Sequence, residues 1–149
     1  KKGNYNLTVD SVVLGTWSEK QLNAGIDLST SFQSPQYRQS DELLKDMNVY
    51  WDIVRRMRQV KYVEYQLLEN KTNDFQVTDK DIKQKFQARL ESFKGQPAEY
   101  VEYYRKNFDE YLQNKPHENE LNKRYEEAFN KLHENNKPVK HIYRLKKVQ

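Results

Sequence analysis

Hydrophobic residues recur at helical spacing over a long stretch in the first half of the chain. Ser40 followed by Asp41 and Glu42 is typical of a helix start, because serine caps the first turn and acidic side chains favour the positive end of the helix dipole. The apolar stripe that follows consists of Leu43, Leu44, Met47, Tyr50, Trp51, Val54, Met57, Val60, Val63, Leu67 and Leu68. It predicts one long central helix over residues 41–70, with other elements packed against both ends.

The spacing predicts three further helices over residues 78–134. Thr78 and Asp81 form a pair like a capping box at the first start, Gly95 ends that helix, and Pro97 and Pro116 suit the first turns of the next two. The apolar stripes of the three helices are Ile82, Phe86, Leu90 and Phe93; then Val101, Tyr104, Phe108, Tyr111 and Leu112; then Leu121, Tyr125, Ala128, Phe129 and Leu132. Each stripe predicts one buried helix face.

The two ends of the chain have a different pattern. Residues 7–14 are rich in β-branched side chains and predict a strand, and residues 17–22 can form a short helix capped by Ser18. Residues 23–40, which include Pro35, predict a loop that can contain a short helix, and the basic stretch 138–148 predicts a second strand. We therefore expect residues 1–149 to form a single, mainly α domain in which the two end strands pair as a small β element.

The composition is consistent with a folded chain that has more aromatic side chains than its core requires. Hydrophobic residues make up only 36%, but aromatic residues make up 13%, with 11 Tyr, 6 Phe and 2 Trp. Each aromatic ring can bury a large area, so a core is possible if the rings face inward. Tyrosine also tolerates half-exposed positions, and part of this set can line a binding surface.

Candidate catalytic chemistry is sparse. The chain has no Cys, which fits an exported protein, and no apolar run approaches the roughly 20 residues of a membrane span. His117, His133 and His141 show no metal-ligand spacing, and no nucleophile elbow or phosphate loop is present. We expect no enzyme activity, no catalytic residue, no metal site and no cofactor.

Basic residues offer one candidate binding surface. The net charge is +4, and the basic side chains gather in two groups: Arg55, Arg56, Arg58 and Lys61, then Lys140, Arg144, Lys146 and Lys147. A basic strand with an interleaved ring could follow a nucleic-acid backbone. Lysines at a strand edge also prevent edge-to-edge pairing. This second explanation is preferred, so nucleic acid is not the expected partner.

Aromatic residues offer a second candidate binding surface. Tyr100, Tyr103 and Tyr104 cannot all face the same side of one helix, so some of these rings must lie at the surface. Exposed rings add contact area for an unfolded segment without demanding a particular sequence. The candidate peptide-binding residues are Tyr62, Tyr65, Phe75, Tyr100 and Tyr103.

Two segments resemble known families. The segment LLKDMNVYWDIVRRMRQVKYVEYQLLENK followed by VTDKDI, with LTVDSVVLGTWSEKQL before it, resembles the N-terminal chaperone domain of parvulin-type secreted foldases. In that family a strand and short helix precede a long helix, and Val-Thr-Asp opens the next one; Val77, Thr78, Asp79, Asp81 and Ile82 match this motif. The resemblance implies an exported or membrane-anchored, extracytoplasmic module that binds unfolded or extended polypeptide. No isomerase domain follows, so isomerase activity is not expected.

The second resemblance is shorter. QPAEYVEYYRKNF, at residues 96–108, is similar to the peripheral-stalk subunit d of mitochondrial ATP synthase. It implies the alternative function of a structural subunit, bound to other subunits of a large complex and located in mitochondria. A third alternative is a basic nucleic-acid-binding domain.

The Thr78 cap gives a prediction that depends on the sequence alone. Thr78→Ala should lower the free energy of unfolding by roughly 0.5–2 kcal/mol, because the first turn loses a hydrogen-bond acceptor. Thermal melts of wild type and variant would measure this. An unchanged midpoint would show that no capped helix begins there.

Overall fold

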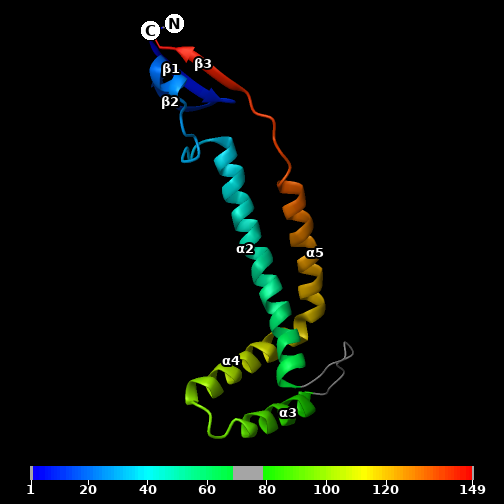
Figure 1. The fold of residues 1–149 in the computed structure, drawn as a ribbon. Coiled ribbons are helices and arrows are strands. Elements are labelled where there is room, and N and C mark those ends of the chain that lie inside the picture. The colour runs from blue at the N-terminus through cyan, green and yellow to red at the C-terminus, as the bar shows by residue number, and fades with distance from the viewer. Residues whose placement is uncertain (1, 69–78, 149) are drawn as a thin grey trace. The chain divides into compact units, whose positions relative to one another are not determined.

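The computed structural model describes residues 2–68 and 79–148, and over this range the chain is mainly helical, with a small antiparallel sheet made by its end strands (Figure 1). This confirms the predicted fold class. The elements are β1 (Asn4–Val9), β2 (Val12–Ser18), α1 (Glu19–Ala24), α2 (Pro35–Tyr62), the π-helix η1 (Val63–Leu67), α3 (Asp79–Ser92), α4 (Ala98–Asn114), the 3₁₀ turn η2 (Lys115–His117), α5 (Glu118–Asn135) and β3 (Tyr143–Lys147). Outside the described range lie the last residues of the predicted long helix and three residues singled out above, Phe75, Val77 and Thr78.

The contacts divide the chain into two compact units. The sheet unit comprises Lys1–Asn48 and Asn130–Gln149, and the helical unit comprises Val49–Phe129. Each unit therefore contains a part of α2 and a part of α5.

The N-terminal strand of the sheet unit differs from the prediction. Residues 7–14 are not one strand: β1 and β2 form a hairpin that turns at Asp10 and Ser11. Asp10 has φ 54°, a left-handed conformation that Asp tolerates better than most residues, and the sequence offers no glycine at this point to mark the turn. The strand order is β2-β1-β3, all antiparallel, so the end strands pair as predicted. Ser18 caps α1, as expected; it also forms a capping box with Gln21, and the helix extends two residues beyond the predicted end at Leu22.

Asp10 also holds the chain segment that enters β3. Its backbone N–H donates to the Ile142 carbonyl (2.8 Å), and its carboxylate accepts from the Ile142 N–H (3.0 Å) and lies 2.9 Å from His141 Nδ1. The Arg144 guanidinium donates to the Asp10 carbonyl at 3.3 Å. One turn residue thus joins the hairpin to the other end of the chain.

The sheet covers a small core and leaves β3 exposed. Leu7, Val9 and Leu14 are buried, with Val12, Trp17, Ile26 and Leu28 packed against them. Every residue of β3 is exposed. Strand pairing and the Asp10 contacts, more than burial, therefore hold β3 in place.

Helix α2 begins earlier than predicted. Ser34 Oγ accepts the backbone N–H of Tyr37 at 3.1 Å, and Pro35 is the first helical residue, so the start lies at residue 35 and not at 41. The sequence interpretation took Pro35 for part of a loop, whereas proline is favoured in the first turn, where its missing N–H costs nothing. The Ser40-Asp41-Glu42 segment lies inside the helix.

The predicted apolar stripe of this helix is buried only in part. Val54 and Val60 are buried, but Leu44 is 60% exposed and Met47 40% exposed. In the sheet unit α2 meets α5 through polar side chains: the Asp46 carboxylate accepts from Lys131 Nζ (2.6 Å) and from the Asn135 side chain (2.9 Å). Because these contacts are polar, the apolar residues of this part of α2 need not be buried for the two helices to meet.

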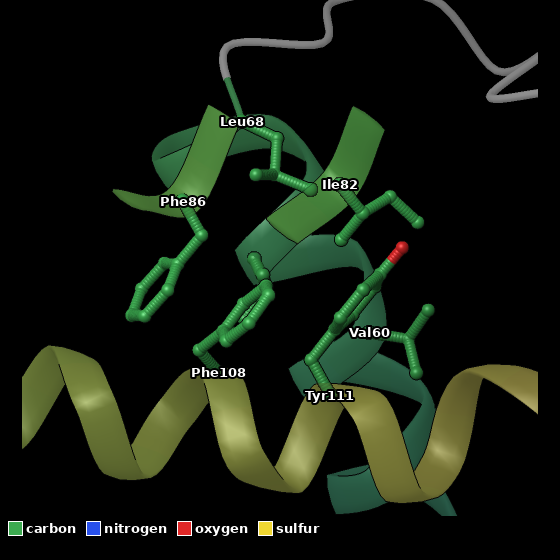
Figure 2. Close-up of a cluster of buried hydrophobic side chains, with 7 residues drawn as sticks. Val60, Leu68, Ile82, Phe86, Phe108 and Tyr111 are labelled. Carbon is green, nitrogen blue, oxygen red and sulfur yellow. The ribbon is translucent and has the colours of Figure 1, made fainter. Parts of the chain in front are cut away.

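The helical unit has an aromatic core, shown in Figure 2. The rings of Phe86 and Phe108 stack with centroids 3.7 Å apart, and Tyr111 lies beside Phe108 at 5.9 Å. The buried residues are Val60, Val63, Leu68, Ile82, Phe86, Phe108 and Tyr111. These are residues of the predicted stripes, and they fix α3 and α4 against the end of α2.

The helix boundaries around this core lie at the glycine and proline residues that were predicted to mark them, with one difference. Gly95 has a positive φ of 89° after α3, and Pro97 precedes α4. Pro116 was expected at the first position of the last helix, but it lies in the 3₁₀ turn η2, and α5 begins at Glu118. Proline interrupts the helical hydrogen bonds, so α4 and α5 run in different directions (Figure 1).

The Asp10 contacts predict a pH dependence. The Ile142 N–H, and next the His141 ring, hold the pKa of Asp10 below its ordinary value of 3.8. Such a carboxylate stabilises the fold fully above pH 3.8 and loses its contribution as the pH falls through the lower, folded-state pKa. Asp10→Asn should therefore lower the thermal midpoint near neutral pH, and the difference from wild type should shrink in strong acid.

The control is Asp27→Asn, since the pKa of Asp27 is also lowered, but by local hydrogen bonds from Ser29, the N–H bond being 2.8 Å long and the other coming from the side chain. Melts of the three proteins across the acid range would compare them. Equal midpoints for Asp10→Asn and wild type at neutral pH would contradict the role given to Asp10.

Candidate functional site

An open groove lies between α2 and α4 in the helical unit, where Figure 1 shows α4 crossing the end of α2. Its volume is about 330 Å³. The lining residues are Trp51, Val54, Arg55, Arg58, Gln59 and Tyr62 from α2, with Tyr103 and Asn107 from α4. The groove joins residues from both predicted candidate sets, Tyr62 and Tyr103 from the aromatic set and Arg55 and Arg58 from the basic set.

The residue spacing explains why these side chains share one surface. Trp51, Arg55, Arg58 and Tyr62 follow one another at intervals of four, three and four residues, which places them on one face of α2. On α4, Tyr103 and Asn107 are four residues apart and lie one position before the core residues Tyr104 and Phe108. Packing of the core thus turns the groove residues toward α2.

Two aromatic side chains of the groove are half exposed. Trp51 is 50% exposed and Tyr103 54% exposed. The Arg58 guanidinium lies over the indole of Trp51, with its central carbon 5.8 Å from the ring centroid, within the range of a cation–π contact. The sequence analysis placed Trp51 in the apolar stripe of the long helix, and in the structure its indole lies at the surface beside a cation.

The polar side chains of the groove are largely satisfied by one another. Gln59 Nε2 donates to the Asn107 carbonyl (3.1 Å) and to Asn107 Oδ1 (2.6 Å), while Asn107 Nδ2 donates to the Tyr103 carbonyl (2.6 Å). Arg55 contacts Glu110 at 3.3 Å on α4. These bonds hold α2 and α4 together along the groove. Sequence reasoning missed Gln59 and Asn107, since nothing in their spacing distinguishes them from other surface amides.

A tyrosine cluster continues from the groove toward the turn between α3 and α4. Burial, and next the neighbouring Tyr103, raise the pKa of the Tyr62 phenol. The Tyr100 hydroxyl donates to the Tyr104 hydroxyl (3.1 Å), which raises the pKa of Tyr100. The ring of Tyr100 also packs against Phe93 at 5.3 Å. Tyr100 is therefore part of the support of the turn and does not line the groove.

A charge cluster fixes the end of α2 to the turn between α4 and α5. Glu64, in the π-helix, is only 4% exposed, and its carboxylate lies 2.5 Å from Lys115 Nζ and 3.2 Å from Lys61 Nζ. Glu118 lies 2.6 Å from each of the same two ammonium groups. Burial alone would lower the pKa of both lysines, but their hydrogen bonds to Glu118 and Glu64 outweigh it and raise the pKa.

The remaining predicted residues lie elsewhere. Tyr65 is 55% exposed but does not line the groove, and Phe75 is outside the described range. Arg56 pairs with Asp52 at 2.8 Å, and Lys61 belongs to the charge cluster. Lys140, Arg144, Lys146 and Lys147 belong to the sheet unit, whereas the first basic group belongs to the helical unit.

A larger cavity, of about 500 Å³, lies in the sheet unit. It is lined by Pro35, Arg38, Gln39, Glu42, Glu134, Asn135, Lys137, Val139 and His141. His141 is oriented by Asp10, but no lining side chain carries a hydroxyl or thiol that an imidazole could activate. The hydrogen bonds that Asp10 accepts from the Ile142 N–H and from Arg144 give this pair a structural role.

Within the described range, no cluster of three or more His, Asp and Glu side chains could hold a metal ion. None of the described helices has the length and apolar character that a membrane crossing requires.

The charge cluster predicts a large effect of one substitution. Glu64→Gln removes the buried carboxylate and leaves Lys61 and Lys115 with Glu118 alone, so the free energy of unfolding should fall by roughly 2–4 kcal/mol. Glu127→Gln is the matched control, because Glu127 is 64% exposed and 3.9 Å from Lys123. It should cost less than about 0.5 kcal/mol. Urea unfolding would compare them, and equal small losses would mean that the cluster does not stabilise the end of α2.

Comparison with known proteins gives a fold and no family. No protein-family model matches the chain, and no curated protein is significantly similar to it. Among solved structures, BT4096, a gut microbial diltiazem-metabolizing enzyme, is similar to this chain with a TM-score of 0.71 and 23% sequence identity. The match covers 99% of this chain and 32% of that one. The chain thus spans about a third of the length of the structure that it matches, and the two share this fold.

Proposed function

We propose that this chain is a non-enzymatic, chaperone-like module that binds unfolded or extended polypeptide through the groove between α2 and α4. The observation that carries the proposal is the pair of half-exposed rings, Trp51 and Tyr103, in one concave surface. Such rings offer apolar area to many different side chains, and both keep a polar atom for water when no client is bound. An extended segment, lacking secondary structure of its own, can lie between the two helices.

The chemistry of the groove supports binding and not catalysis. Its lining contains no carboxylate and no histidine, so it offers no side chain suited to general acid–base catalysis near neutral pH. The solved structure with this fold belongs to an enzyme, but the likeness at 23% identity concerns the fold of a third of that chain. It supports no activity for this protein.

The proposed location is extracytoplasmic, as for the foldases that the sequence resembles. The chain has no cysteine, so it needs no reducing compartment to protect a free thiol. A mitochondrial location remains the alternative, tied to the resemblance with the stalk subunit.

A second candidate function is a structural module within a larger assembly. It is favoured by exposed apolar side chains of the sheet unit: Leu44 is 60% exposed, Ile142 52% and Leu145 55%. Such residues would be covered if another domain or subunit packed there. In this case the isolated chain should be poorly soluble or should self-associate.

The proposed function predicts that the purified chain slows aggregation of a chemically denatured client, without nucleotide. Light scattering at several molar ratios would measure this, and circular dichroism and sedimentation would establish that the chain is folded and monomeric. A prolyl isomerase assay should show no activity. A folded monomer that gives no protection at several-fold excess would contradict the chaperone proposal and favour the structural module.

A matched pair of variants locates the activity. Tyr103→Ser removes a ring that is 54% exposed in the groove, and Tyr65→Ser removes one that is 55% exposed outside it. Protection should weaken several-fold for the first variant and stay near wild type for the second. Equal losses would assign the effect to general surface hydrophobicity.

A further inference from the structure

One cation of the groove has no ion-pair partner in residues 2–68 and 79–148. Arg55 contacts Asp52 and Glu110, both at 3.3 Å, and Arg56 contacts Asp52 at 2.8 Å. Among the described residues, no carboxylate lies within ion-pair distance of Arg58, whose guanidinium instead contacts the Trp51 ring. The groove therefore presents one uncompensated positive charge.

The other polar groups of the groove are less able to hold a charged ligand. The donors of Gln59 are occupied by Asn107, and the side-chain amide of Asn107 by the Tyr103 carbonyl. Arg58 is the group left to provide charge-assisted hydrogen bonds. Its guanidinium presents several N–H donors in one plane, a geometry that matches a carboxylate, and stacking on Trp51 reduces its rotational freedom before a ligand arrives.

Apolar surface lies directly beside this charge. Trp51, which carries Arg58, and Tyr103 are the two half-exposed rings, and Val54 contributes a buried aliphatic side chain. The volume of about 330 Å³ is at the lower end of the range for ligand pockets, so a few side chains would fill the groove.

We propose that the groove selects polypeptide segments in which an Asp or Glu stands next to a large apolar residue. The client carboxylate pairs with Arg58, and the apolar side chain packs against Trp51 and Tyr103. The proposal rests on the proposed function, and it adds a charge preference that a purely hydrophobic holdase would lack. It also gives a role to Arg58, the groove arginine that pairs with no carboxylate in the part of the chain that the structure describes.

Three labelled peptides test it. Each has the same Gly- and Ser-rich flanks and a central pair of Phe-Glu, Phe-Lys or Ser-Glu. Fluorescence anisotropy with the wild-type chain should give an affinity for Phe-Glu about tenfold higher than for either of the others, and this preference should fall as salt is added. Equal affinities for Phe-Glu and Phe-Lys would overturn the charge preference. Equal affinities for Phe-Glu and Ser-Glu would reduce the groove to a simple anion site and overturn it as well.

Variants assign the preference to one side chain. Arg58→Gln should abolish the ratio between Phe-Glu and Phe-Lys, and Arg58→Lys should retain part of it. Arg105→Gln is the control, because Arg105 lies on α4 outside the groove, is 54% exposed and pairs with Glu102 at 3.6 Å. Circular dichroism would establish that each variant is folded. A ratio unchanged in Arg58→Gln would overturn the proposal.

The intrinsic fluorescence of the groove gives an independent measurement. The chain has two tryptophans, so Trp17→Phe leaves Trp51 as the single reporter. The Phe-Glu peptide should shift the Trp51 emission at the concentration at which anisotropy changes, and a silent Trp51 would overturn the assignment to this groove. Loss of the charge preference with intact protection from aggregation would refute only this inference. Loss of both peptide binding and protection would refute the proposed function too.

Discussion

The rotation of α4 about its axis is the constraint on which the helical unit depends. Tyr104, Phe108 and Tyr111 lie at intervals of four and three residues and pack into the aromatic core. The residues one position earlier, Tyr103, Asn107 and Glu110, have the same spacing and therefore lie on the neighbouring face, about 100° away. Once the core has formed, these three side chains must meet α2. The stacked rings of Phe86 and Phe108 thus position the groove without being part of it.

The same division applies to α2. Val60 and Val63 enter the core, while Trp51, Arg55, Arg58 and Tyr62 occupy the face toward the groove. The charge cluster around Glu64 stops this helix from turning, because the carboxylate is held by lysines from α2 and from the turn after α4. A buried carboxylate in a π-helical segment is costly to place, and π-helical turns are frequent at functional sites. In this chain the π-helical segment that carries Glu64 directly follows Tyr62, a residue that lines the groove.

Much of this architecture was readable in the sequence, and the failures have physical causes. Gly95, Pro97 and the stripes of α3 and α4 were sufficient because a buried helix face has a fixed period. The hairpin was missed because its turn is only two residues long and has no glycine, so the β-branched residues on either side of Asp10 and Ser11 look like one continuous strand. The exposure of Trp51 could not be predicted, because periodicity places a residue on a helix face but does not reveal whether another element covers that face. The sequence shows that Trp51 and Arg55 are four residues apart and so share a helix face. It does not show that Tyr103 and Asn107 of α4 lie opposite them, because that depends on how the helices pack.

The pairing of β1 with β3 has a consequence for how the protein is made. Tyr5 of β1 pairs with Lys147 of β3. In the sequence, all residues of the helical unit, Val49–Phe129, come after β1 and before β3. During synthesis the β1–β2 hairpin emerges before β3, and its open strand edge must wait for β3, on the order of ten seconds at ribosomal rates. The helical unit can fold in that interval, and the contact of Tyr50 with Phe129, at 6.4 Å between ring centroids, shortens the loop that remains to be closed. From the synthesis of β1 until that of β3, the nascent chain therefore carries an unprotected β edge.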